Sequence, residues 1–227
     1  KPDTPPRPGI YVDYCDHVIM PSVFFAEHYN TLSEKNLYLG SPKYDIEIDD
    51  GKTYEKYSLN KDKKMALVVF PRSRDLNKID LEVLYGYLHN MGYDILVKTR
   101  GKDPAPSNLR GDHYFEDASW FPHTTMELIR VSDFVINFSS TAIKECIMLK
   151  KPFMNFHIKP YGLPPAYFLY EYSYCKQMEI DCSFGEFQAT ALSLVEKDHN
   201  ISFEQSIKNH LFDKTGVCKN IIDYIFS

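Results

Sequence analysis

The sequence predicts an α/β fold built on a doubly wound, parallel, Rossmann-like sheet. A first βαβ unit is indicated by a buried run at residues 65–70 (MALVVF), apolar residues at helical spacing over 79–91, and a second apolar run at 93–97. A second unit has the same order within residues 132–156, where strand, polar turn, helix and strand follow one another. Because helices join these strands, we expect parallel pairing with right-handed crossovers.

The segment ahead of these units is predicted to form a smaller piece. Residues 1–9 (KPDTPPRPG) are rich in proline, which is typical of a linker. Residues 10–45 are expected to hold a strand around 17–20, a helix over about 21–32, and then a strand that leads into a turn. Residues 46–227 are then the main domain, which ends in helices.

The acidic run Asp49-Asp50-Gly51 has two interpretations. Adjacent aspartates before a glycine are typical of a turn. Two carboxylates also suit a metal ion, but they lack the Asp-x-Asp spacing that we would expect for such a site. The turn is therefore the favoured interpretation.

Three further regions complete the main domain. A short strand is expected at residues 112–115 and a helix at 124–131. Residues 156–174 follow the end of a strand and are rich in proline and tyrosine, so we expect a loop over the ligand edge of the sheet. The tail from residue 184 is predicted to form two or three amphipathic helices. Their expected core residues are Leu192, Leu194, Val195, Ile207, Leu211, Ile221, Ile222 and Ile225.

Composition narrows the function classes. The 227 residues are 44% hydrophobic and 25% charged, with a net charge of −5, so no basic footprint for nucleic acid is evident. Five cysteines without a Cys-x-x-Cys pair favour a reducing, cytoplasmic compartment. Neither a signal peptide nor a membrane-spanning run is recognised. Because the chain starts with Lys1, we expect neighbouring domains of a longer polypeptide as partners.

The polar turn in the second βαβ unit is the main candidate for a ligand site. Residues 133–137 are typical of a buried strand, and Ser139, Ser140 and Thr141 precede a helix over 142–149. A helix start at the carboxyl end of a parallel strand suits a phosphate. Glu145 lies one turn beyond Thr141, where it would accept hydrogen bonds from ribose hydroxyls. The alternative is that the turn only caps the helix and Glu145 is solvated.

Basic residues follow both strands of the first βαβ unit. Arg72 and Arg74 come after one strand, and Lys98 and Arg100 after the next. Carboxyl ends of parallel strands share one edge, so all four side chains are expected to face a diphosphate. The alternative is an ordinary solvated surface loop.

The run DFVINFSSTAIKECIMLKKPFMNF resembles the donor-site signature of GT-B glycosyltransferases and their relatives, the UDP-N-acetylglucosamine 2-epimerases and the CDP-glycerol glycerophosphotransferases. The resemblance implies a diphosphate at Ser139, Ser140 and Thr141, a ribose at Glu145, and a Lys-Pro pair at Lys151-Pro152. The usual glycine of that turn is absent. DHVIMPS and LGSPKYD resemble the end of a GT-B acceptor domain, which implies a donor domain behind a truncated acceptor-side piece.

The resemblance extends to the loops around the site. PRSR and KTRGKDP resemble the PTxR and KxHP motifs of CDP-glycerol transferases, without the histidine of the second. In GT-B donor domains the segment that holds Trp120, Phe121 and His123 lines the base pocket. The loop after residue 156 often touches the donor sugar, and its candidates are His157, Lys159, Tyr161 and Glu171.

The resemblance implies a glycosyltransferase that moves a hexose or deoxyhexose from a UDP-linked sugar to a hydroxyl of an oligosaccharide or glycan acceptor, without metal or cofactor. The candidates for a catalytic base are Asp13, His17 and His157, with Asp16 and Glu27 in the wider pool. A CDP-polyol phosphotransferase and a non-catalytic nucleotide-binding module are the alternatives. The plan also resembles compact glycosyltransferase domains of large DNA viruses, which transfer sugars such as rhamnose and would act in the host cytoplasm.

Overall fold

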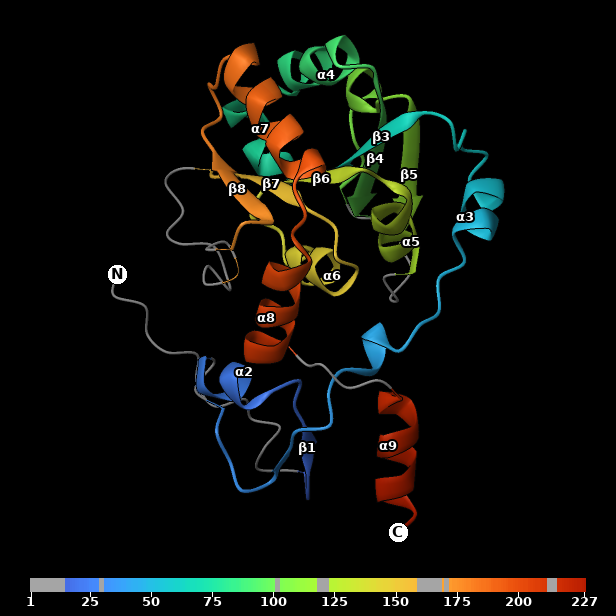
Figure 1. The fold of residues 1–227 in the computed structure, drawn as a ribbon, viewed down its shortest axis with the longest axis vertical. Coiled ribbons are helices and arrows are strands. Elements are labelled where there is room, and N and C mark those ends of the chain that lie inside the picture. The colour runs from blue at the N-terminus through green and yellow to red at the C-terminus, as the bar shows by residue number, and fades with distance from the viewer. Residues whose placement is uncertain are drawn as a thin grey trace. The chain divides into compact units, whose positions relative to one another are not determined.

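The computed structural model describes residues 15–28, 31–100, 103–117, 123–158, 169, 172–211 and 216–227 (Figure 1). The chain divides into two compact units. One comprises the described residues of Lys1–Glu47 and Glu204–Ser227, and the other those of Ile48–Phe203. The domain boundaries expected from the sequence stay a prediction.

The larger unit is built on a parallel sheet of six strands in the order β5-β4-β3-β6-β7-β8. The first strand of this sheet along the chain is β3, in the middle. The chain then moves outward to β5, returns to β6 beside β3, and moves outward again to β8. This is the predicted doubly wound arrangement. The strands are β3 (Lys64–Val69), β4 (Tyr93–Arg100), β5 (His113–Asp117), β6 (Phe134–Asn137), β7 (Phe153–Phe156) and β8 (Cys175–Met178).

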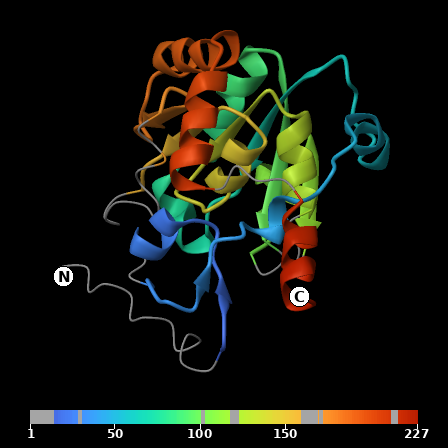
Figure 2. The ribbon, with the colours of Figure 1, turned by 60° about the horizontal axis from the view of Figure 1, so that its bottom comes forward.

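Helices cover both faces of this sheet. α4 (Leu81–Asn90) and α7 (Phe184–Glu196) lie on one face, and their apolar side chains share a core with alternate strand residues such as Val68 and Ile136. α5 (His123–Val131) and α6 (Ile143–Met148) lie on the other face, next to each other (Figures 1 and 2). The layered order is therefore that of an α/β domain.

The smaller unit contains a short parallel pair, β1 (Val18–Ile19) and β2 (Asn36–Leu37), joined through α2 (Val23–His28). The 3-10 turn η1 (Pro42–Tyr44) follows β2. α8 (Asn200–His210) spans the boundary between the units, and α9 (Val217–Ile225) ends the chain.

Asp45 joins two distant segments of the smaller unit. Its carboxylate accepts hydrogen bonds from the backbone N–H groups of Gly216, at 3.0 Å, and Cys218, at 2.8 Å. The Cys218 bond is the main cause that lowers the pKa of Asp45 below its usual value, and the Gly216 bond adds to it. A carboxylate at the start of α9 also complements the helix dipole.

Two elements of the larger unit were missed by the sequence interpretation. The predicted turn at Asp49 is instead the N-cap of α3 (Asp50–Lys56), and the Asp49 side chain accepts from the Lys52 N–H. β8 lies just beyond the loop expected at residues 156–174, and no strand is predicted there because CKQM lacks the apolar alternation of a strand. β8 pairs on one side with β7, and its exposed residues are polar as expected of a strand near an edge.

The predicted core of the tail is only partly right. Leu194 and Leu211 are buried, but Leu192 and Val195 on α7 are exposed. The inward face of α7 is instead Phe187, Ala191 and Leu194, at the i, i+4, i+7 spacing of one helix face. Ile222 and Ile225 on α9 are exposed as well, and Ile207 and Ile221 are half-buried. Within the described residues, none of the helices combines the length and hydropathy needed to cross a bilayer.

Candidate functional site

The strand order places two loops next to each other at the carboxyl edge of the sheet. β3 and β6 are paired neighbours, yet the chain leaves them in opposite directions across the sheet. The loop after β3 carries Arg72 and Arg74, and the turn after β6 is Ser139 to Thr141. In open α/β sheets, ligands bind in the crevice where the strand order reverses. The fold therefore brings two predicted parts of the site together.

The turn after β6 has a backbone conformation that residues other than glycine rarely adopt. Ser139 has a φ of 53°, in the left-handed region. Its N–H donates to Oδ1 of Asn155 on the neighbouring strand β7, at 2.9 Å. The Ser140 hydroxyl accepts a long bond of 3.4 Å from the Ala142 N–H. Ser139 and Ser140 are half-buried and Thr141 is exposed.

Asn155 belongs to a row of three amides that the sequence interpretation overlooked. Nδ2 of Asn137 donates to Oδ1 of Asn155 at 2.7 Å, and Nδ2 of Asn155 donates to Oε1 of Gln177 at 2.9 Å. The three residues are register partners on β6, β7 and β8. We call this row the amide ladder. Its signal in the sequence is a single asparagine in each of two otherwise apolar strands, FVIN and FMNF.

Glu145 is not solvated, so this part of the alternative interpretation is wrong. Its exposed fraction is only 5%, although it lies in the first turn of a six-residue helix. Its neighbours Ile143, Cys146 and Ile147 are buried too. A carboxylate kept this far from water requires compensating polar contacts.

The two basic loops are tied together by a hydrogen bond. The Ser73 hydroxyl, between Arg72 and Arg74, bonds to Oδ1 of Asp103 beyond β4, at 2.7 Å. Arg72 is exposed. Arg74 is exposed too and forms a 3.9 Å ion pair with the buried carboxylate of Asp75. The Arg72 guanidinium is therefore the better placed of the two to meet an anion.

Lys98 and Arg100 lie within β4 and not in a loop, because the strand continues to Arg100 through its pairing with β5. The expectation that they follow the strand is wrong. The Lys98 side chain is only 8% exposed, and Nζ donates to the Thr99 carbonyl oxygen at 2.6 Å. Lys98 shares a face of the sheet with the amide ladder, since its register partner Val69 lies beside β6. The Arg100 side chain lies outside the described structure.

The other predicted site residues are only partly covered. Asp13, Trp120 and Phe121 lie outside the described residues, as do Lys159, Tyr161 and Glu171. His123 begins α5, but its side chain is not described. His157 follows β7 at the same sheet edge as the turn and is half-buried. His17 is exposed in the smaller unit, where its ring packs edge-on against Tyr224 with 5.5 Å between the ring centroids. Asp16 and Glu27 are exposed in the same unit.

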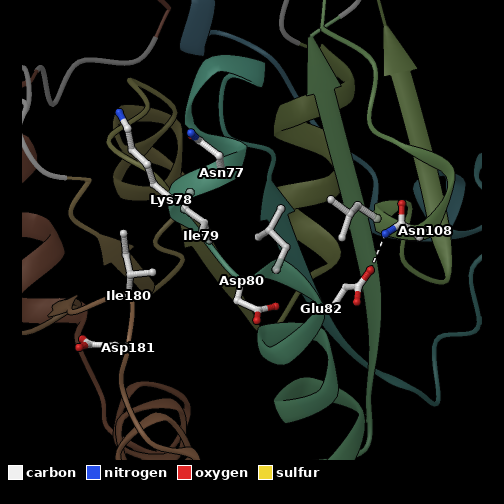
Figure 3. A pocket seen from close by; sticks show the side chains of 10 residues that line it. Asn77, Lys78, Ile79, Asp80, Glu82, Asn108, Ile180 and Asp181 are labelled. Atoms are coloured by element: carbon white, nitrogen blue, oxygen red, sulfur yellow. Dashed lines mark hydrogen bonds between the residues drawn. The ribbon is translucent and has the colours of Figure 1, made fainter.

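A cavity of ≈ 540 Å³ lies at the start of α4, on the face of the sheet that α4 and α7 cover (Figure 3). Asp80 and Glu82 line it from the helix, and Asp181 lines it from the opposite side. Oε1 of Glu82 accepts from Nδ2 of Asn108. Lys78 also lines the cavity, but its ammonium pairs with Asp75 at 3.0 Å. This acidic lining is unsuited to a diphosphate.

The cysteines of this unit are not arranged for nucleophilic chemistry. Cys146 is fully buried, and burial is the main cause that raises the pKa of its thiol well above the usual range, with the nearby Glu145 adding to it. Burial also raises the pKa of Cys175 far above its usual value. Among the residues that the structure describes, no group of three or more His, Cys, Asp or Glu side chains is arranged to hold a metal ion.

Solved structures share this fold. A variant of the wall teichoic acid polymerase TagF aligns with a TM-score of 0.66 and 18% identity, over 93% of this chain and 57% of that chain. A second TagF structure gives a TM-score of 0.64 and 18% identity, over 94% and 58%. The UDP-GlcNAc 2-epimerase of Methanocaldococcus jannaschii, in complex with UDP-GlcNAc and UDP, gives 0.56 and 10% identity, over 94% and 62%.

This chain thus spans between 57% and 62% of the length of these three structures. No protein-family model matches the sequence, and comparison with curated proteins finds no relative. The predicted resemblance is confirmed at the level of the fold: the chain has a GT-B-like fold.

Proposed function

We propose that the larger unit binds the diphosphate of a nucleotide-activated donor between the loops after β3 and β6, and that the protein transfers a glycosyl group from this donor to a hydroxyl acceptor. One observation carries the proposal. In a GT-B-like fold, the point where the strand order reverses holds a left-handed turn fixed by a neighbouring side chain, with an arginine loop beside it.

The leaving diphosphate would be stabilised by backbone and side-chain donors together. The turn supplies the hydroxyl groups of Ser139 to Thr141 and backbone N–H groups after Ser139, and Arg72 supplies a guanidinium that can bind two phosphate oxygens at once. Lys98 and Arg100 add positive charge from the adjacent strand β4. Fixed donors of this kind stabilise the charge that develops as the bond to the sugar breaks. Transfer without a metal ion is therefore part of the proposal, and activity in EDTA tests it.

Glu145 is proposed to hold the ribose. It lies one helical turn beyond Thr141, so it reaches a group just past the diphosphate. A carboxylate would repel the phosphates but accept hydrogen bonds from both ribose hydroxyls, and such charge-assisted bonds are strong. Trp120, Phe121 and His123 are proposed to contact the base. Trp120 and Phe121 come just before α5 and His123 is its first residue, and α5 leads directly into β6.

The donor is proposed to be a UDP-linked hexose or deoxyhexose, such as rhamnose. Support comes from the UDP-GlcNAc 2-epimerase of this fold, whose structure contains UDP-GlcNAc and UDP. The acceptor is proposed to be a glycan hydroxyl, deprotonated by Asp13, His17 or His157. Of these three, His157 is the one that the structure places in the same unit as the turn.

Transfer of a polyol phosphate from a CDP-linked donor is the second candidate. The specific observation in its favour is the likeness to the wall teichoic acid polymerase, whose TM-score of 0.66 exceeds the 0.56 of the epimerase. Both candidates require the same grip on a diphosphate. They differ in the base, in the donor and in the bond that is broken. Glycosyl transfer breaks the bond from the sugar carbon to the diphosphate, whereas polyol phosphate transfer breaks a bond from phosphorus to oxygen within the diphosphate.

Calorimetric titration with UDP, CDP and GDP tests the proposal. We expect saturable binding of one nucleotide, with UDP favoured. Incubation with UDP-sugars or CDP-glycerol, followed by assay of released nucleotide, then separates the two transferase candidates. Binding without turnover of any donor would leave a nucleotide-binding module, and absence of binding by all three nucleotides would contradict the proposal.

A further inference from the structure

The turn after β6 is held by a side chain from another strand, and this contact has consequences for the proposed diphosphate site. A left-handed backbone at Ser139 is unfavourable for a residue with a side chain, so a compensating interaction is required. The hydrogen bond from its N–H to Oδ1 of Asn155 supplies it. The exposed fraction of Asn155 is 0%, so water does not compete for this bond.

The Ser139 N–H also fixes the orientation of every amide in the ladder. A backbone N–H only donates, so the atom of Asn155 that it meets must be the oxygen. The nitrogen of Asn155 is then directed to Oε1 of Gln177. Because Oδ1 of Asn155 also accepts from Asn137, both of its lone pairs are used and no rotation of the amide is tolerated.

The ladder is asymmetric between its two ends. Gln177 is exposed, so solvent can replace its bond. Asn137 is fully buried next to β3, and its Oδ1 has no hydrogen-bond partner within the part of the chain that the structure describes. An apolar pair would fill the interior of β6 and β7 without the cost of burying an unpaired polar group. The buried amides are therefore best explained by what they hold, which is the turn.

We propose that Asn155 is a positioning residue, which fixes the Ser139 turn in the conformation that receives the diphosphate. Asn155 acts through Ser139 and touches no part of the donor itself. The inference rests on the proposed nucleotide site and names the residue that preorganises it. A turn already held in its bound conformation does not lose conformational freedom on binding, and this raises affinity.

The test compares Asn155→Leu with Gln177→Met in the full chain. Asn155→Leu keeps the number and branching of the side-chain heavy atoms and removes the acceptor of the Ser139 N–H. Gln177→Met alters the exposed end of the same ladder and leaves that bond intact. We expect Asn155→Leu to weaken UDP binding about tenfold or more by calorimetry, with binding of uridine unchanged, because uridine has no phosphates. Gln177→Met should bind both ligands like the wild type.

Hydrogen exchange of the Ser139 amide, measured by NMR in the wild type, provides a readout that needs no variant. We expect protection of this amide without nucleotide, and loss of protection in Asn155→Leu. Rapid exchange of the wild-type amide would overturn the inference even if the variant failed to fold. If the wild type binds UDP and a folded Asn155→Leu binds it equally well, the inference is wrong and the proposed function stands. If the wild type binds no nucleotide, both are wrong.

Discussion

Two helices of the larger unit begin at the same edge of the sheet, and their starts differ in what surrounds them. α4 follows β3 and has Asp80 as its N-cap, with the carboxylate accepting from the Val83 N–H at 3.1 Å. α6 follows β6 and has Ala142 at the N-cap, whose methyl group cannot accept a hydrogen bond. The α4 start lines an acidic cavity, whereas the α6 start follows the turn anchored by Asn155.

The comparison shows that the presence of a cavity does not by itself identify an anion site. At α4 the helix uses its own carboxylate to satisfy a free N–H group, and the further carboxylates of Glu82 and Asp181 oppose an anion. At α6 the only acidic residue of the first turn is Glu145, and its side chain is buried. Available donors and the local charge therefore favour the α6 edge for a diphosphate.

The largest effect is expected from Glu145, the first-turn glutamate of α6, with Glu82 in the first turn of α4 as its control. Glu145→Gln should weaken UDP binding about 30-fold, or ~2 kcal/mol, because the charged acceptor of the ribose hydroxyls is lost. Glu82→Gln makes the same change at α4 and should leave UDP binding as it is. Calorimetry on both folded variants checks this. Equal losses, or none for Glu145→Gln, would remove the distinction between the two helix starts.

A smaller effect is expected from the arginine loop. Arg72→Gln should weaken UDP binding up to about tenfold at low ionic strength, and the difference from the wild type should shrink as salt is added. The matched control is Arg130→Gln in the last turn of α5, where the guanidinium pairs with Asp50 at 2.8 Å. A titration at two salt concentrations measures both. If the two substitutions change UDP affinity equally at both salt concentrations, Arg72 has no specific part in the site.

Removal of the α4 cap should affect stability and leave binding intact. Asp80→Ala is expected to lower the free energy of unfolding by about 1 kcal/mol, because the Val83 N–H loses its acceptor. Urea denaturation gives this value, and calorimetry gives the UDP affinity. A loss of UDP affinity in Asp80→Ala would show that the acidic cavity takes part in nucleotide binding after all.

The smallest effect concerns the residue that follows α6. Burial is the main cause that lowers the pKa of Lys151 below its usual value of 10.5. Between the folded and unfolded pKa values the unfolded chain binds more protons, so this residue makes stability rise with pH in that interval. The free energy of unfolding of Lys151→Met relative to the wild type should therefore decline as the pH rises towards 10.5. A difference that is independent of pH would contradict the burial effect.

Much of this fold was predictable from the sequence, because the buried strands β3, β6 and β7 and the periodic helix α4 have strong local patterns. β8 was not, since CKQM pairs with β7 for reasons of tertiary context. The extension of β4 through Lys98 depends on β5, which no local pattern shows. The turn and Glu145 were found as site candidates from the sequence, and the assignment of their roles stays a prediction.

The amide ladder could not be predicted in the same way. Single asparagines in buried strands are visible in the sequence, but the contact between Asn137 and Asn155 requires the strand register. The link from Asn155 to the Ser139 N–H also requires the backbone conformation of the turn. Local sequence therefore indicates which segment forms the turn, and the tertiary structure shows what holds it.

A crystal structure of the protein soaked with UDP tests the central claim most directly. We expect the diphosphate to lie against Ser139 to Thr141, with Arg72 facing it and Glu145 within hydrogen-bonding distance of the ribose. A nucleotide bound in the cavity at the start of α4, or anywhere away from the edge between β3 and β6, would contradict the account.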